Sequence, residues 1–286
     1  RCDAQLTLHH KRQKLLCHHC GAEQEVARRC PSCQGEKLHP LGEGTERVEG
    51  ALQKFFPRAR IERIDRDSTS RKGALEEKLR RVHEGEADIL VGTQMLSKGH
   101  DFPNVTLVGI LNADQGLYGT DFRSSERLFQ LIMQVSGRAG RADKPGEVLI
   151  QTWHPDHPLF AALQRHDFHG FAEFALNERR ETSYPPYSHL VLLRAESPTP
   201  DAALRFLHEA RTLALPLSPG KDVQILAPAP APMERRAGRY RAQLLVQSSQ
   251  RAPLHEFLGQ WVAQLAEAKF AKKTRWSLDV DPMDMY

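Results

Sequence analysis

The sequence predicts an α/β domain built on a parallel sheet, followed by a smaller α+β domain and preceded by a cysteine-rich segment. Between residues 44 and 154, continuous apolar runs alternate with amphipathic segments, the pattern of a parallel sheet covered by helices on both faces. After Pro185-Pro186, the clearest linker in the chain, the expected order becomes strand, helix, strand, strand, helix, strand. All five cysteines fall within the first 33 residues. We therefore expect three parts, at residues 1–40, 41–184 and 185–286.

The composition is that of an ordinary globular protein. Of the 286 residues, 40% are hydrophobic and 27% are charged, which excludes wholesale disorder. No apolar stretch is long enough to cross a membrane, and the N-terminus has neither a signal-peptide core nor a starting methionine. We therefore expect a piece of a longer protein that does not span a membrane. Because a secreted disulfide scaffold would spread its cysteines through the whole chain, the confinement of all five to one end favours a metal module and a cytoplasmic protein. The net charge of +4 permits a nucleic-acid partner without requiring one.

Helices and strands are expected to alternate through the α/β part. Segment 45–56 predicts a helix that Pro57 stops, and segment 73–84 predicts a helix with Leu75, Leu79 and Val82 on one face. Apolar runs predict strands at 61–64, 88–92, 106–111 and 147–151. Further helices are expected at 124–135 and, as a pair, within 158–183.

The C-terminal part is expected to have the βαββαβ order of a ferredoxin-like fold. The predicted strands are 189–195, 223–226, 240–247 and 276–280, and the predicted helices are 201–214 and 254–268. The alternating Ala-Pro segment 227–232 is expected to be a stiff loop that acts as a spacer.

Two C-x-x-C pairs, Cys17/Cys20 and Cys30/Cys33, predict a zinc module in the first part of the chain. Each pair places two thiolates on a tight turn, where both can reach one tetrahedral zinc. A redox C-x-x-C is the alternative, but it would need a βαβ context that this segment lacks. Cys2 is left over. The four histidines of the segment are better explained as solvated surface residues, and they are His9, His10, His18 and His19.

The run Gln134-Val-Ser-Gly137-Arg138-Ala-Gly140-Arg141 ends a predicted helix with two arginines and two glycines. Guanidinium groups bind phosphate through paired hydrogen bonds and stabilise charge on a transferring phosphoryl group. A basic helix C-terminus with a glycine cap is the simpler alternative. The full pattern after a parallel α/β segment favours a phosphate site.

The loop that follows the strand at 88–92 is rich in polar groups. Loops at the carboxyl ends of parallel strands are where such sheets bind ligands. This loop offers Thr93, Gln94, Lys98 and Asp101 together, more polar groups than a structural turn needs.

A basic run with one interleaved aromatic, Tyr240, lies in the C-terminal part. Arginines beside an aromatic residue suit phosphate contact and base stacking, although a charged strand edge exposed to solvent gives the same pattern. The arginines of this run are Arg235, Arg236, Arg239, Arg241 and Arg251.

The segments GTQMLSKGHDFPNV (92–105) and QVSGRAGR (134–141) resemble motifs V and VI of superfamily 2 helicases. Together with RIDRDSTSRKG (63–73), the cysteines and LDVDP (278–282), they resemble the bacterial primosomal replication-restart helicases, the PriA family. The resemblance runs through the whole chain. It implies a second RecA-like lobe carrying a zinc-binding insertion, followed by a C-terminal domain that contacts fork DNA.

The resemblance also implies roles for the two loops. Arg138 and Arg141 would act on ATP phosphates across a cleft between two lobes, with Gln134 and Gly137 shaping that site. In the other loop, Gly99 and Asp101 would couple the nucleotide state to the grip on DNA. The positions nearer the DNA track would be Thr93 and Gln94. Independently of the resemblance, the basic run of the C-terminal part makes Arg239 and Arg241 further candidates for DNA contact.

For the metal, the family pattern is two zinc ions held by eight cysteines. Cys2, Cys17 and Cys20 would then belong to one site, and Cys30 and Cys33 would close the other. This conflicts with the single zinc ribbon that the two pairs suggest in isolation, and the two-zinc pattern is preferred because it explains Cys2.

A translocating ATPase needs a P-loop and an acidic motif for Mg²⁺, and neither occurs here. Gly220-Lys221 is followed by Asp222, in the wrong domain. The chain alone is therefore not expected to hydrolyse ATP. The resemblance predicts a 3′–5′ DNA helicase. Two alternatives stay open, a fork-binding platform without ATPase activity and an RNA-binding zinc-ribbon protein.

The partners that the resemblance implies are forked and single-stranded DNA, single-stranded-DNA-binding protein, other primosome proteins and a replicative-helicase loader. Arg251 is the candidate contact for the acidic tail of single-stranded-DNA-binding protein. A monomer is expected.

Overall fold

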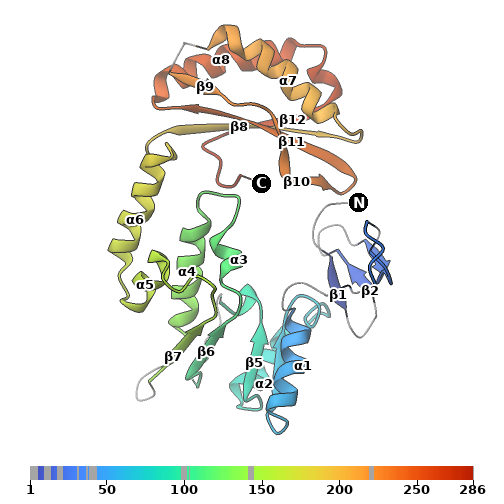
Figure 1. Ribbon diagram of the computed structural model, residues 1–286, viewed down its shortest axis with the longest axis vertical. Coiled ribbons are helices and arrows are strands. Elements are labelled where there is room, and N and C mark those ends of the chain that lie inside the picture. The colour runs from blue at the N-terminus through green and yellow to red at the C-terminus, as the bar shows by residue number, and fades with distance from the viewer. Residues whose placement is uncertain are drawn as a thin grey trace.

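The computed structural model describes residues 6–9, 14–17, 22–30, 32–36, 38, 44–97, 102, 104–140, 145–218 and 222–285 (Figure 1). Several predicted site residues lie outside this described part, namely Cys2, Cys20, Gly99, Asp101 and Arg141. Within it, no helix is long and apolar enough to cross a membrane.

The N-terminal segment forms a small antiparallel sheet. Its strands are β1 (Thr7–His9), β2 (Lys14–Leu16) and β3 (Glu23–Glu25), in the order β1-β2-β3. The strands have three residues each and bury little, so the segment depends on something other than an apolar core for its stability.

The α/β part contains parallel strands and covering helices, as the sequence predicts. Strand β4 (Ile61–Ile64) pairs with β5 (Ile89–Gly92), and β6 (Leu107–Ile110) pairs with β7 (Glu147–Ile150), both in parallel. The hydrogen-bonded strands thus form two pairs in the described part, not one continuous sheet. The helical elements are α1 (Thr45–Phe55), α2 (Ala74–His83), η1 (Gln94–Ser97), α3 (Asp114–Leu117), α4 (Ser124–Ser136), α5 (Pro158–Gln164) and α6 (Phe168–Glu181).

Helix α4 is held in place by an apolar core that it shares with α5 and α6. Leu128, Phe129 and Ile132 of α4 are buried, and the Phe129 ring stacks on Phe171 of α6 with centroids 4.2 Å apart. Burial of these side chains, spaced three and four residues apart, fixes the rotation of α4 about its axis. That rotation sets the direction of the side chains at the C-terminal end of α4.

The C-terminal part has the predicted βαββαβ order with one additional strand. Its antiparallel sheet runs β10-β11-β8-β12. Along the same edge of β11, β10 pairs with residues 239–243 and β9 pairs with residues 246–248. Omitting β10, the order β12-β8-β11-β9 is that of the ferredoxin-like fold. The elements are β8 (His189–Ser197), α7 (Ala202–Ala214), η2 (Leu215–Leu217), β9 (Val223–Ile225), β10 (Ala229–Arg236), β11 (Arg239–Ser248), α8 (Arg251–Glu267), η3 (Ala271–Lys273) and β12 (Arg275–Val280).

The prediction of a spacer loop at 227–232 is wrong, because most of this segment belongs to β10. β10 lies at the edge of the sheet, where proline is tolerated since one side of the strand needs no ladder hydrogen bonds. The register shifts between Pro230 and Arg235. A two-residue turn, Ala237-Gly238, joins β10 to β11 with φ of 51° and 84°, the positive values of a type I′ hairpin.

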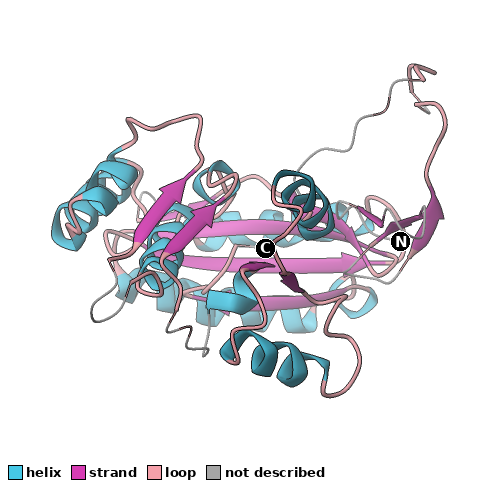
Figure 2. Ribbon diagram, turned by 90° about the horizontal axis from the view of Figure 1, so that it is seen from below, coloured by secondary structure: helices cyan, strands magenta, loops and turns pink. Residues whose placement is uncertain are grey.

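Helices α7 and α8 cover the same face of this sheet (Figures 1 and 2). Trp261 of α8 is fully buried there, and its indole Nε1 donates a hydrogen bond to the carbonyl of Ala210 on α7 at 2.9 Å. The opposite face has no covering helix in the described part.

Candidate functional site

The two-arginine motif lies at the C-terminal end of α4. The N–H of Gly137 donates to Met133 O at 3.1 Å, and the N–H of Arg138 donates to Val135 O at 3.0 Å, so the last turn stays closed. Gln134 and Gly137 are exposed and Arg138 is half-buried. Within the described part of the chain, the Arg138 guanidinium has no ion-pair partner, which leaves it available to an anion.

Two close backbone contacts fix residues 139 and 140, which follow. The N–H of Gly140 donates to Val105 O, just before β6, at 2.9 Å. Gly146, just before β7, lies against the Ala139–Gly140 peptide, and a Cβ at position 146 would be 2.3 Å from the Ala139 carbonyl carbon. Only glycine fits at that distance. Sequence reasoning missed Gly146, and its only signal was a glycine immediately ahead of an apolar strand.

The polar loop after β5 lies on an element that touches α4. Gly92 ends the strand, and a Cβ there would be 2.6 Å from Ile64 O and 2.4 Å from a methyl carbon of Leu96. The chain turns into η1, which contacts α4. Thr93 and Gln94 are exposed. The structure therefore brings the two predicted motifs onto neighbouring elements.

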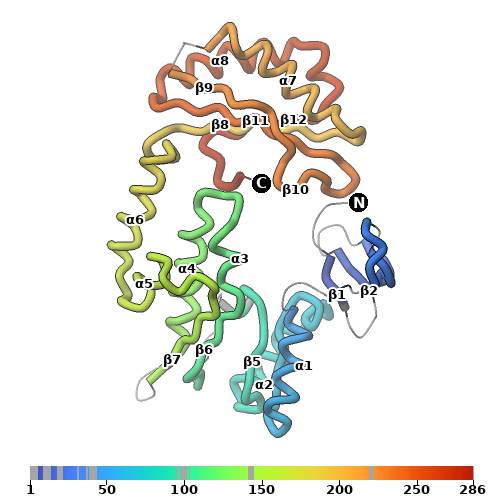
Figure 3. The backbone as a smooth tube through the Cα atoms, viewed as in Figure 1, coloured from blue at the N-terminus to red at the C-terminus, as the bar shows by residue number. Residues whose placement is uncertain are grey.

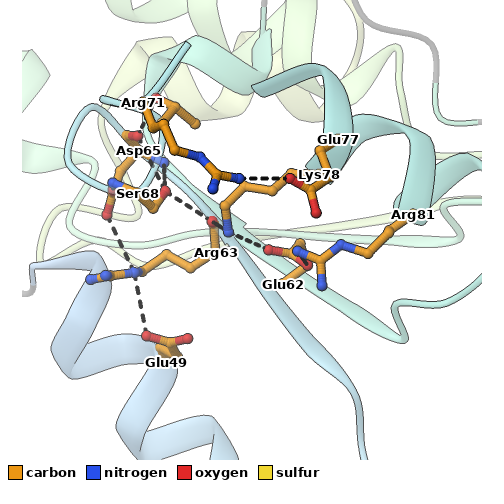
Figure 4. Close-up of polar contacts among 10 residues, drawn as sticks. Glu49, Glu62, Arg63, Asp65, Ser68, Arg71, Glu77, Lys78 and Arg81 are labelled. Atoms are coloured by element: carbon orange, nitrogen blue, oxygen red, sulfur yellow. Dashed lines mark hydrogen bonds and ion pairs between the residues drawn. The ribbon is translucent and has the colours of Figure 1, made fainter. Parts of the chain in front are cut away.

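The segment 63–73 forms the end of β4 and the turn after it (Figure 4). The Asp65 side chain is 8% exposed and accepts hydrogen bonds from Thr45 Oγ1 at 2.5 Å and from the N–H of Ser68 at 2.7 Å. Burial raises the pKa of the Asp65 carboxyl. The bonds from Thr45 and Ser68 and the charge of Arg63 outweigh burial, so its pKa lies below the usual value.

Six charged side chains around this turn form a network, here called the β4 network. Lys78 Nζ and Arg81 Nη2 of α2 lie 2.5 and 2.8 Å from the two carboxylate oxygens of Glu62. Arg63 Nε lies 3.3 Å from Glu49 of α1. With three acidic and three basic members, the β4 network neutralises itself and fastens α1 and α2 to β4. Its members are Glu49, Glu62, Arg63, Asp65, Lys78 and Arg81.

The second cysteine pair lies on a tight turn. The N–H of Cys30 donates to Gly35 O and the N–H of Gln34 donates to Cys30 O, both at 2.9 Å. The backbone N–H groups of Cys33 and Ser32 lower the pKa of the Cys30 thiol. A turn whose N–H groups favour thiolate over thiol fits a zinc ligand pair.

The first cysteine pair is described only through Cys17, which is buried and whose N–H donates to Ala22 O at 2.9 Å. Cys17, Cys30 and Cys33 form no disulfide within the described residues. No group of three metal-binding side chains comes together within the described residues, and Cys2 and Cys20 are outside them.

The basic run of the C-terminal part lies on the β10–β11 hairpin. Arg236 and Arg239 face each other across the two strands beside the turn, and both are exposed. The Arg235 guanidinium lies over the Tyr240 ring, 5.0 Å from its centroid. In the described part of the chain, none of these three arginines has an acidic partner.

Two other arginines of the run are paired with carboxylates. Arg241 is 10% exposed at its side chain, and its Nε lies 3.5 Å from Glu196 of β8, its register partner. Burial lowers the pKa of Arg241. Arg251, at the start of α8, lies 3.5 Å from Asp281. Arg239 is thus better placed than Arg241 to meet an external anion.

Comparison with known proteins gives three family models in chain order. Residues 1–24 match the PriA DNA helicase Cys-rich region domain, residues 35–143 the helicase conserved C-terminal domain, and residues 180–283 the primosomal protein N C-terminal domain.

The curated relatives carry the name replication restart protein PriA. That of Haemophilus influenzae is 44% identical over 99% of this chain and 38% of its own length. That of Bacillus subtilis is 44% identical over 99% of this chain and 35% of its own length. That of Rickettsia conorii is 34% identical over 100% of this chain and 43% of its own length. The chain therefore spans well under half the length of these relatives.

Among solved structures, a de novo designed protein superposes on 34% of this chain, and 99% of its own, with a TM-score of 0.26 at 7% identity. A score this low carries no conclusion about the fold. The relatives aligned along nearly the whole chain and the three models in order agree with each other. The chain belongs to the PriA family of replication restart proteins, with a helicase conserved C-terminal domain ahead of the family's C-terminal domain.

Proposed function

We propose that this chain is the part of an ATP-dependent 3′–5′ DNA helicase that senses nucleotide and contacts fork DNA, and that the whole protein starts primosome assembly at abandoned forks. The observation that supports this most is the position of the two-arginine motif at the C-terminal end of α4. Arg138 leaves the last turn of α4 half-buried, without an ion-pair partner in the described part, and two glycine contacts fix the loop behind it.

In this proposal, ATP with Mg²⁺ supplies the phosphoryl group and is bound mainly by residues outside this chain, which lacks a P-loop. Arg138 and Arg141 provide guanidinium groups that stabilise charge on the transferring phosphoryl group. Gln134 and Gly137 shape the surface beside them. Gly99 and Asp101 follow η1 in the sequence and lie outside the described residues; in this proposal they link the nucleotide state to the grip on DNA.

The zinc assignment remains that of two sites, Cys2 with Cys17 and Cys20, and Cys30 with Cys33. The tight turn at Cys30 supports a thiolate pair, and the match to a cysteine-rich family domain supports the first site. Metal analysis of the full-length parent should give two zinc ions per chain. One ion would favour a single ribbon. No zinc, with C-x-x-C disulfides present, would refute the module.

For DNA, we propose that Thr93 and Gln94 lie along the track of the translocating strand and that the β10–β11 hairpin meets phosphates through Arg239, with Arg241 behind it. The further partners are single-stranded-DNA-binding protein, through Arg251, other primosome proteins and the replicative-helicase loader. We also propose the division at 1–40, 41–184 and 185–286 and a cytoplasmic monomer. Two separate apolar cores, one around α4 and one under α7 and α8, support that division.

The test replaces Arg141 or Arg138 with Ala in the full-length parent. DNA-stimulated ATP hydrolysis should fall by about a thousandfold or more, since guanidinium groups at such sites contribute that much. Binding of forked DNA, measured by fluorescence anisotropy, should stay within about twofold. Arg58→Ala, an exposed arginine after α1, is the matched control. Survival of hydrolysis in both variants would refute the assignment.

An alternative is a fork-binding platform that has lost ATPase activity. The ATPase rate of the full-length parent, with and without forked DNA, separates the two. Strong stimulation supports the motor, and no hydrolysis on any DNA supports the platform. An RNA-binding zinc-ribbon protein would instead show equal affinity for RNA and forked DNA.

A further inference from the structure

The loop between α3 and α4 carries an aromatic residue that lies against the linker to the C-terminal part. The Phe122 ring stacks on Tyr184, with centroids 4.6 Å apart and 12° between the planes. Two guanidinium groups also lie over the Phe122 ring, that of Arg123 at 4.0 Å and that of Arg179 at 4.9 Å from the centroid. Phe122 therefore contacts both the linker, through Tyr184, and the end of α6, through Arg179.

The first turn of α4 adds polar contacts to the same junction. Glu126 forms an ion pair with Arg179 at the end of α6, and Arg179 Nη1 also donates to Pro185 O at 2.9 Å. Arg127 Nη2 donates to the carbonyl of Met283, in the tail after β12, at 2.7 Å. Figure 3 shows this tail descending from the C-terminal sheet to the loop ahead of α4.

The loop itself is fixed from within. The Asp121 side chain is fully buried, and it accepts the N–H of Arg123 at 2.9 Å and lies 3.1 Å from Arg127 Nη2. Ser124 Oγ donates to Asp121 O at 2.6 Å, which ties the first residue of α4 to the loop. A displacement of the tail or the linker thus acts on α4 directly and is not absorbed in the loop.

On the other side, the linker is fastened to the C-terminal sheet. Gln247 Nε2 of β11 donates to Ser183 O and, at 3.1 Å, to Ser188 Oγ. Ser188 Oγ donates to Ser183 O at 2.6 Å. Contacts therefore run without a gap from β11, through Ser183 and Tyr184, to Phe122 and α4.

Helix α4 connects this junction to the phosphate-sensing motif. It begins at Ser124 beside the junction and ends at Ser136, just before Arg138. Its 13 residues span about 20 Å. A helix of this length moves as one body, because its backbone hydrogen bonds and its buried face resist bending.

The contacts of Phe122, Glu126 and Arg127 with the linker, the end of α6 and the tail are here called the Phe122 junction. We infer that this junction couples the C-terminal domain to the Arg138 end of α4, with Phe122 and Arg127 as positioning residues. This rests on the proposed function. DNA bound by the C-terminal domain biases the position of the tail and linker, and α4 carries that bias to Arg138. Coupling between such sites changes an affinity or a rate by roughly five- to 150-fold.

The experiment uses the full-length parent with Phe122→Ala and, separately, Arg127→Ala. Basal ATP hydrolysis and affinity for forked DNA should each stay within about twofold, while stimulation by forked DNA falls about tenfold. Phe122→Tyr, which keeps the stacked ring, should restore stimulation. Phe55→Ala, a 79% exposed phenylalanine on α1, is the matched control and should change nothing. Arg127 is 46% exposed, and Arg123 stays beside the buried Asp121 when Arg127 is replaced, so this variant keeps its fold even where Phe122→Ala does not.

Hydrogen exchange at residues 137–139 provides a readout that needs no hydrolysis. Forked DNA should slow exchange there in the wild type and leave it unchanged in Phe122→Ala and Arg127→Ala. Unchanged stimulation in both variants, or an equal fall in basal and stimulated rates, would overturn the inference. Absence of hydrolysis in the wild type would refute the proposed function, whereas DNA-dependent protection at 137–139 that is lost in the variants would still support the coupling.

Discussion

Gly146→Ala is the substitution that tests most directly how the two-arginine motif is seated. The added Cβ would lie 2.3 Å from Ala139 C, 2.4 Å from Gly140 N and 2.5 Å from Ala139 O, whereas ordinary contact begins at 3.4 Å. All three atoms are backbone, so no side chain can rotate away. The 139–140 peptide must withdraw by about 1 Å.

That shift weakens the hydrogen bond from Gly140 N–H to Val105 O and moves the peptide next to Arg138. Overpacking of this kind costs about 1–3 kcal/mol of stability. A displacement of about 1 Å at a group that acts on the reacting atoms lowers the rate by about a hundredfold. We expect both a loss of stability and a loss of rate. The fall in the hydrolysis rate should be larger than the fraction of unfolded protein explains.

The assay measures DNA-stimulated ATP hydrolysis and thermal unfolding of the full-length parent. Gly109→Ala is the matched control, because Gly109 lies in β6 of the same strand pair and a Cβ there meets nothing within 4 Å. Wild-type hydrolysis and an unchanged melting temperature in Gly146→Ala would show that Gly146 does not pack against the 139–140 peptide.

Two further predictions concern stability. The Arg60 side chain and its N–H hold the pKa of Asp88 at about 2, below the usual 3.8, so this carboxylate contributes stability that is complete above pH 3.8 and is lost as the pH falls towards 2. Asp88→Asn should therefore flatten the pH dependence of urea unfolding between these values, and an unchanged slope would contradict the assignment. Asp65→Ala leaves Thr45 Oγ1 and the Ser68 N–H without their acceptor and should cost about 1–3 kcal/mol in the same assay. Full stability in that variant would show that the β4 network is dispensable.

The C-terminal fold was predictable because its signals are local. Helices α7 and α8 follow from apolar periodicity, and β8 and β11 follow from apolar runs bounded by turns. The error at β10 has an equally physical cause. Prolines count against a strand unless it lies at an edge, and edge position is a property of the assembled sheet. Ala237 with a φ of 51° also gave no warning of a hairpin turn, since glycine, asparagine or aspartate is the usual residue there.

The site was predictable in its motifs and not in its contacts. Residue types and spacing pointed to Gln134, Gly137 and Arg138, and the structure places all three at the end of one helix. The role of Gly146 depends on how closely two segments approach in space, which spacing along the chain does not encode. The same holds for Arg241, whose pairing with Glu196 follows from the register of β11 on β8.

Two basic segments that look alike in sequence differ in what they offer an anion. At the β4 network, which includes Arg63 and Asp65 of segment 63–73, acidic groups equal basic groups in number, so an incoming phosphate would have to displace an existing partner there. On the β10–β11 hairpin, Arg236 and Arg239 are direct register partners, and neither forms an ion pair with a carboxylate among the described residues. Like charges placed opposite each other destabilise a strand pair, and an anion between them removes that repulsion. A phosphate would therefore stabilise the hairpin, whereas at the β4 network it would have to displace a carboxylate, and this difference supports our proposal that the C-terminal sheet contacts a nucleic-acid backbone.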